Sequence, residues 1–334
     1  MTVTNNTTRR LLLWSATMLA GVAGLMSGGA GAADYPNRVI TVLVPHAAGG
    51  PTDTVARLVA QSMTGTLGQA VIVENVGGAG STLGTARAAR AEPDGYTLLL
   101  NHVAQATSAA LYRKLPYDPV ESFVGIGLIT DVPMTIVAKH DLKPGSIAEL
   151  IAYIKAEKDK VAYAHAGVGS ASHLCGMLFM DAIDAAMTTV PYKGTGPAMN
   201  DLLGGQVDVM CDQTTNTANQ IRGGKIKGYA VTTKERLAVL PDLPTLGEAG
   251  VAGFEMTVWH GLYAPKGTPK AVVDKLAPAL QAALADAKVV ERFRDLGTEP
   301  VTADRATPEA LDRHLRAEVA KWQPIIKASG VYAE

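Results

Sequence analysis

The chain has 334 residues, a formal net charge of −1, 47% hydrophobic residues and 18% charged residues. This length favours two domains over one, and the composition is that of a folded protein, not of a disordered charged tail. Because no run of like charges offers a polyanion a binding face, nucleic acid is not an expected partner.

The first 33 residues carry the pattern of a cleavable secretory signal. Arg9 and Arg10 precede an apolar run at residues 11–26, and small residues lead to a cleavage position after Ala32 or Ala33. A membrane anchor is the alternative, but polar residues and glycines interrupt the run, which is shorter than the ~20 apolar residues of a span. We therefore expect export to the periplasm without a membrane span, by the ordinary or the twin-arginine route.

Beyond this segment, short β-branched runs alternate with amphipathic segments, which is typical of an α/β fold with largely parallel sheets. The clearest predicted strands are residues 39–44, 70–74, 96–100, 161–164, 207–211 and 226–231. Ser146 and Glu149 predict a capping box, and Thr268 and Thr307 each predict a helix cap before a proline. Without a repeat or a low-complexity linker, the domains should be joined by strands, with one domain visited twice by the chain.

Two glycine-rich turns, each between a predicted strand and a predicted helix, are candidate anion sites. The first comprises His46, Ala47, Ala48, Gly49, Gly50, Pro51, Thr52 and Asp53. The second comprises His165, Ala166, Gly167, Val168, Gly169, Ser170, Ala171 and Ser172. Such turns expose unpaired backbone N–H groups at the positive end of a helix dipole, so facing turns could close on one carboxylate or phosphate. A tight connection with a capping side chain is the alternative for each.

Other patterns weigh against catalysis and cofactors. The glycine stretch at residues 77–84 lacks the spacing of a dinucleotide fingerprint, so no cofactor is predicted. Ser170, His173 and Asp212 raise the alternative of a hydrolase, but the nucleophile-elbow pattern is absent around Ser170. The seven histidines and two cysteines form no close-spaced ligand set, so no metal site is predicted.

The two cysteines are Cys175 and Cys211, and neither lies near the cleavage region where a lipid anchor would need one. An oxidising compartment permits one disulfide between them. The alternative is that each is a small buried apolar side chain, and the sequence leaves both possibilities open.

Nine ordered motifs resemble the Bug-type periplasmic receptors of tripartite tricarboxylate transporters, over essentially the whole mature chain. They are residues 44–53 (VPHAAGGPTD), 73–80 (VENVGGAG), 93–97 (PDGYT), 115–119 (LPYDP), 166–173 (AGVGSASH), 190–194 (VPYKG), 203–208 (LGGQVD), 244–250 (PTLGEAG) and 264–269 (APKGTP). The resemblance implies a type II periplasmic-binding-protein fold, with two lobes joined by crossing strands and a ligand cleft between them. We place the crossings near Val132 and Met256, which makes residues 34–132 plus 257–334 domain 1 and residues 133–256 domain 2.

The resemblance also implies a ligand and a partner. A small carboxylate would be held between residues 46–53 and 167–172, often through water, and presented to inner-membrane transporter subunits without any bond being made or broken. It further implies the pocket residues Asn101, His102, Gln105, Tyr192 and Asp212.

Departures from the family pattern at His46, Ala48 and Val76 leave the ligand open among di- or tricarboxylates, amino acids and aromatic acids. Two other function classes stay open: a ligand-loaded co-sensor for a membrane kinase and a periplasmic enzyme on the same fold.

Overall fold

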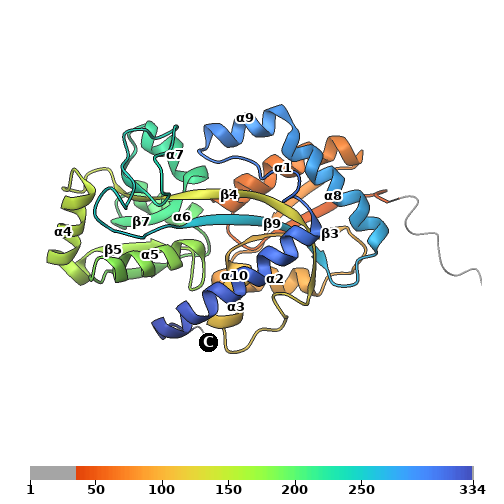
Figure 1. Cartoon of the computed structure of the whole chain (residues 1–334), viewed down its shortest axis with the longest axis horizontal. Coiled ribbons are helices and arrows are strands. Elements are labelled where there is room, and N and C mark those ends of the chain that lie inside the picture. The colour runs from red at the N-terminus through yellow and green to blue at the C-terminus, as the bar shows by residue number, and fades with distance from the viewer. Residues whose placement is uncertain (1–34, 333–334) are drawn as a thin grey trace, which may run out of the picture.

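The computed structural model describes residues 35–332, so the predicted signal peptide lies outside the described residues. Two lobes lie side by side, and two long strands run between them (Figure 1). The strands are β1 (Ile40–Val44), β2 (Val71–Asn75), β3 (Thr97–His102), β4 (Phe123–Lys139), β5 (Ala162–His165), β6 (Thr188–Pro191), β7 (Val209–Gln213), β8 (Ile226–Val231) and β9 (Thr257–Pro265). The α-helices are α1 (Pro51–Leu67), α2 (Thr82–Ala89), α3 (Ala104–Leu111), α4 (Ile147–Glu157), α5 (Ala171–Ala182), α6 (Thr195–Leu203), α7 (Thr214–Arg222), α8 (Lys270–Ala285), α9 (Ala287–Asp295) and α10 (Pro308–Ser329).

All six strands predicted most clearly from the sequence are present, within two residues of their expected bounds, as β1, β2, β3, β5, β7 and β8. The central strands β3 and β7 are buried along almost their whole length, whereas the edge strand β2 is largely exposed, with Ile72 50% accessible. The two longest strands, β4 and β9, were not among those predictions. Glycines and a proline interrupt the apolar pattern of β4, and its register with β9 is irregular at residues 125–127 and 128–130.

The strand order is β2-β1-β3-β9-β4-β7-β5-β6, with β8 also paired to β4. Within each lobe the short strands are parallel, as expected, whereas β4 and β9 run antiparallel to each other and to their neighbours. Up to Pro133, β4 pairs with β9, and from Met134 onward it pairs with β7 and β8. One strand therefore belongs to the sheets of both lobes, and together with β9 it joins them.

Two of the three predicted helix caps are confirmed. Ser146 accepts a hydrogen bond from the Glu149 amide and Thr307 accepts one from the Ala310 amide, each at 3.2 Å. The prediction for Thr268 was wrong: α8 has no side-chain cap, and the Thr268 hydroxyl donates to the Pro265 carbonyl (2.8 Å). The next residue, Pro269, has an extended backbone and is itself the N-cap of α8.

Of the two alternatives for the cysteines, the structure shows the disulfide. Cys175 on α5 is bonded to Cys211 on β7, with the Cα atoms 6.0 Å apart. This bond ties the helix that follows the second glycine-rich turn to the strand that ends at Asp212 and Gln213. Within residues 35–332, no helix combines the length and apolar character that crossing a bilayer requires.

Candidate functional site

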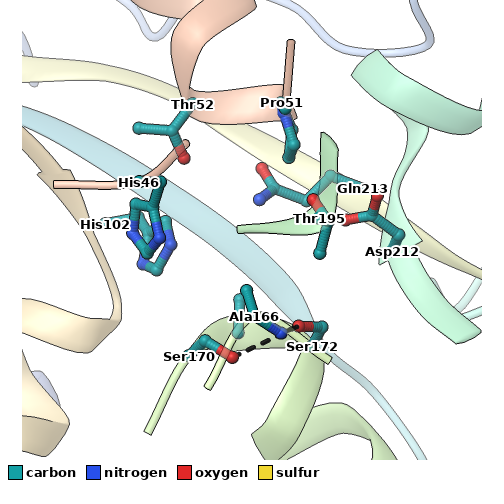
Figure 2. Close-up of a pocket in the computed structure, with 12 residues that line it drawn as sticks. His46, Pro51, Thr52, His102, Ala166, Ser170, Ser172, Thr195, Asp212 and Gln213 are labelled. Carbon is teal, nitrogen blue, oxygen red and sulfur yellow. Dashed lines mark hydrogen bonds between the residues drawn. The ribbon is translucent and has the colours of Figure 1, made fainter. Parts of the chain in front are cut away.

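A cavity of about 10 Å³ lies between the lobes, with side chains of both lobes around it (Figure 2). A space of this size holds about one water molecule, so the lobes are closed around it. The first lobe lines it with His46, Gly50, Pro51, Thr52 and His102. The second lobe lines it with Ala166, Ser170, Ala171, Ser172, Thr195, Asp212 and Gln213.

Four helices begin at this cavity: α1, α5, α6 and α7, whose N-cap residues are Gly50, Ser170, Gly194 and Gln213. Only Ser170 caps its helix with a side chain, because its hydroxyl accepts from the His173 amide at 3.2 Å. The other three helix starts have no side-chain cap, so amide N–H groups of their first turns are available to a ligand. The lining residues include neither lysine nor arginine. Helix dipoles and backbone donors therefore provide a positive potential that suits an anion.

Three histidine rings pack together on the first lobe, and two of them, His46 and His102, line the cavity. The rings of His46 and His102 stack with centroids 4.5 Å apart, and His260 meets His102 edge-on at 5.7 Å. Burial lowers the pKa of His46 to about 4 and that of His260 to about 3, so both rings are neutral at pH 7. Since His102 Nδ1 accepts from the Ala104 amide (3.1 Å), its neutral ring carries the proton on Nε2. Within residues 35–332, no group of His, Cys, Asp and Glu side chains is arranged to hold a metal ion.

Two serine hydroxyls line the cavity at the start of α5, on the second lobe. Ser172 Oγ accepts from the Ala166 amide at 2.9 Å and lies 3.2 Å from Ser170 Oγ (Figure 2). The Tyr163 hydroxyl donates to the Ser172 carbonyl, which fixes the first turn of α5 against β5. These contacts hold both hydroxyls at the cavity before any ligand arrives, and this reduces the entropy lost on binding.

Asp212 and Gln213 end β7 at a third side of the cavity and are 1% and 2% exposed. Asp212 Oδ2 accepts from the Asn216 amide at 2.6 Å. Burial raises the pKa of Asp212 to about 6, and the bonds from Asn216 and from the Gln213 amide offset part of that effect. The Thr195 hydroxyl is also near enough to lower this pKa.

Three predicted site residues lie behind the cavity, where they brace it. Asp53 accepts from the Gly49 amide and from Asn75, each at 3.0 Å, which closes the first glycine-rich turn. Asn101 donates to Gln105 at 2.9 Å, and Gln105 donates to the Pro119 carbonyl at 2.7 Å. Their polar groups form hydrogen bonds with other residues of the first lobe.

The remaining predicted residues lie along the line where the lobes touch, which we call the lobe seam. Three hydrogen bonds define it: Ala47 N–H to the Lys193 carbonyl (3.0 Å), Thr107 Oγ1 to the Gly169 carbonyl (3.2 Å), and the Tyr112 hydroxyl to the Val168 carbonyl (3.1 Å). The predicted residues on the seam, or in the hollow along its outer side, are Ala47, Ala48, Gly49, Gly167, Val168, Gly169 and Tyr192. They lie where closure would bring the lobes together, not inside the cavity.

The sequence-based prediction did not include Thr195, Gln213 or the buried His260 among the site residues. Thr195 follows the glycine of the 190–194 motif, and Gln213 lies two residues beyond the predicted strand 207–211, directly before a helix. The rule that identified the first two helix starts would have identified these two as well. His260 lies inside a long strand and has no local signal.

Comparisons with known proteins agree with this arrangement. Residues 55–331 match the family model described as tripartite tricarboxylate transporter family receptor. An Agrobacterium vitis protein described as a UPF0065 protein in the TAR-I ttuE-ttuC' intergenic region is 53% identical over 96% of this chain and 90% of its own length. The structure of periplasmic binding protein BugD has a TM-score of 0.88 at 54% identity, over 90% of this chain and all of BugD. The structure of MatC from Rhodopseudomonas palustris with bound malate has a TM-score of 0.84 at 41% identity, over 87% of this chain and all of MatC.

Proposed function

The chain belongs to the tripartite tricarboxylate transporter receptor family, and we propose that it captures a small carboxylate in the periplasm and presents it to the transporter's membrane subunits. The observation that carries this proposal is the meeting of four helix N-termini at one interlobe cavity lined by no cationic side chain. Backbone N–H groups and serine hydroxyls recognise a carboxylate by hydrogen bonding, without a buried lysine or arginine. Malate bound to MatC, a relative of the same fold, supports a small carboxylate as the class of ligand.

In the proposed cycle, an open form binds the ligand on one lobe and then closes. The two bodies that move are residues 35–132 plus 257–332 and residues 133–256, and the hinge lies where β4 exchanges β9 for β7 and β8. Closure adds the contacts of the second lobe to the ligand. Only those added contacts shift the balance toward the closed form, because a ligand favours a state by its differential affinity for it.

We propose that the site binds its ligand and does not catalyse a reaction on it. A serine hydrolase would need a base beside Ser170, but the His173 ring turns its Nδ1 toward the Gly169 amide at 3.4 Å. Ser170 Oγ is instead occupied by the His173 amide and by Ser172 Oγ. The serine therefore serves as a helix cap and as a ligand donor, and nothing at the site activates it as a nucleophile.

Thermal unfolding with a ligand panel tests the proposal. The exported full-length chain would be purified from the periplasm of an expression host, unfolded and refolded to remove carried-over ligand, and melted with di- and tricarboxylates, amino acids and aromatic acids. A ligand at 100 times its dissociation constant adds ~2.7 kcal/mol to the unfolding free energy. We expect stabilisation by small carboxylates only. Absence of any shift across the panel for a cooperatively folded protein would reject the function.

A further inference from the structure

Two acceptor atoms at the cavity have no hydrogen-bond partner in the described part of the chain: Asp212 Oδ1 and Gln213 Oε1. Both side chains are buried and both line the cavity. The Thr195 hydroxyl lies near Asp212, but it has only one proton to donate and each carboxylate oxygen has two lone pairs. Buried acceptors are normally paired, so two of them at one binding cavity indicate that a ligand supplies the donor.

Asp212 and Gln213 are on one side of the cavity, and the rings of His46 and His102 are across from them (Figure 2). The helices α6 and α7 begin on the Asp212 side, whereas the start of α1 and the serine hydroxyls at the start of α5 lie away from it. A ligand carboxylate is favoured at the start of α1 and at the serine hydroxyls, because these donors are not beside Asp212. The same carboxylate would be repelled beside Asp212, because two like charges at close range in a buried site are unfavourable. The Asp212 side therefore fits a neutral or positive donor.

We infer that the ligand bears a hydroxyl or ammonium group that donates to Asp212, and that Asp212 and Gln213 select hydroxy- or amino-substituted carboxylates over unsubstituted ones. This inference rests on the proposed carboxylate-binding function and narrows it. An unsubstituted ligand would leave a buried acceptor unpaired, which lowers affinity on the order of 5- to 150-fold. A site built to bond a substrate hydroxyl or amine discriminates strongly against the analogue that lacks it.

Three ligands with one four-carbon dicarboxylate skeleton test the inference: succinate without a donor, L-malate with a hydroxyl and L-aspartate with an ammonium. Calorimetric titration of the refolded full chain should give at least about tenfold tighter binding of malate or aspartate than of succinate. Which of the two binds more tightly identifies the donor. Succinate binding as tightly as both would overturn the inference and leave the proposed function standing. If no carboxylate of the wider panel binds either, the function itself fails.

Two variants assign the preference to residues. Asp212→Asn keeps the shape and can still accept from Asn216 through its carbonyl, but it directs an amide donor at the ligand. We expect its preference for malate or aspartate over succinate to shrink to about threefold or less. Gln213→Leu removes the second acceptor without a charge change and should also narrow the preference. Asp242→Asn, on an exposed loop, is the matched control and should behave as wild type. If both variants fold and keep the wild-type preference for malate or aspartate over succinate, the assignment of that preference to Asp212 and Gln213 is refuted. The three titrations of the wild type decide the ligand class even if a variant does not fold.

Discussion

A substitution at Gly196 tests lobe closure separately from folding. The nearest atoms to a methyl group added there all belong to the opposite lobe. The residue lies in the first turn of α6, and a Cβ atom on it would be 2.6 Å from the Ala48 carbonyl oxygen and 3.1 Å from Gly49 C. A separation of 2.6 Å is shorter than any normal carbon to oxygen contact, so the lobes cannot close fully in Gly196→Ala. Within α6 itself, alanine is a better helix former than glycine by about 1 kcal/mol.

The expected cost follows from overpacking. Forcing one methyl group into a packed contact costs about 1–3 kcal/mol, and here the closed form alone bears it. Ligand affinity should therefore fall about 5- to 150-fold, while the unfolding temperature without ligand stays the same or rises. Titration calorimetry measures the first quantity and a thermal melt the second.

Gly65→Ala is the matched control, because Gly65 is also inside a helix, α1, and its added Cβ would have no atom within 4 Å. This control should gain the same helix stability and keep wild-type affinity. Wild-type affinity in Gly196→Ala would refute the reasoning, since it would mean that the Ala48 to Gly196 contact is not part of the ligand-bound state.

Three further predictions concern stability. Replacing Cys175 and Cys211 together by alanine should lower the unfolding free energy by about 3–4 kcal/mol, as expected for a cross-link over 36 residues, and a loss below 1 kcal/mol in urea titrations would contradict this. Because burial lowers the pKa of His46 from 6.5 to about 4, its contribution to stability is complete above pH 6.5 and is lost as pH falls through 4. The unfolding free energy of His46→Gln should therefore fall by up to about 3 kcal/mol less than that of the wild type as the pH is lowered from 6.5 to 4. The same pH profile in both proteins would contradict this prediction. Burial raises the pKa of Asp212 from 3.8 to about 6, so the pH dependence of its contribution to the unfolding free energy is opposite to that of His46. The contribution of Asp212 to stability is complete below pH 3.8 and is lost as pH rises through 6. Asp212→Asn should therefore stabilise the ligand-free protein at pH 8, and destabilisation there would oppose the assignment.

The sequence predicted the local elements well because their signals are local. Continuous apolar runs marked β1 and β5, and the caps at Ser146 and Thr307 lie where the side-chain pattern placed them. The prediction failed at Thr268, because the turn continues one residue further before the helix begins, so Pro269 takes the N-cap position.

The candidate site was predicted in outline and not in detail. Both glycine-rich turns do reach the cavity, yet Asp53 points away from it and braces its own turn. Gly167 and Gly169 serve the contact between the lobes, which depends on how two distant segments meet. His260 packs behind the cavity wall against His102 because β9 pairs beside β3, a pairing between residues about 160 positions apart that no local pattern encodes.

Titration calorimetry of the refolded full-length chain with L-malate tests the central claim most directly, because it measures whether a small carboxylate binds in the interlobe cavity. We predict saturable binding of one malate per chain, with a negative heat-capacity change from the surface buried on closure, and weaker binding in Gly196→Ala. Absence of saturable binding for malate and for every other carboxylate of the panel, in a protein that melts cooperatively, would contradict the account.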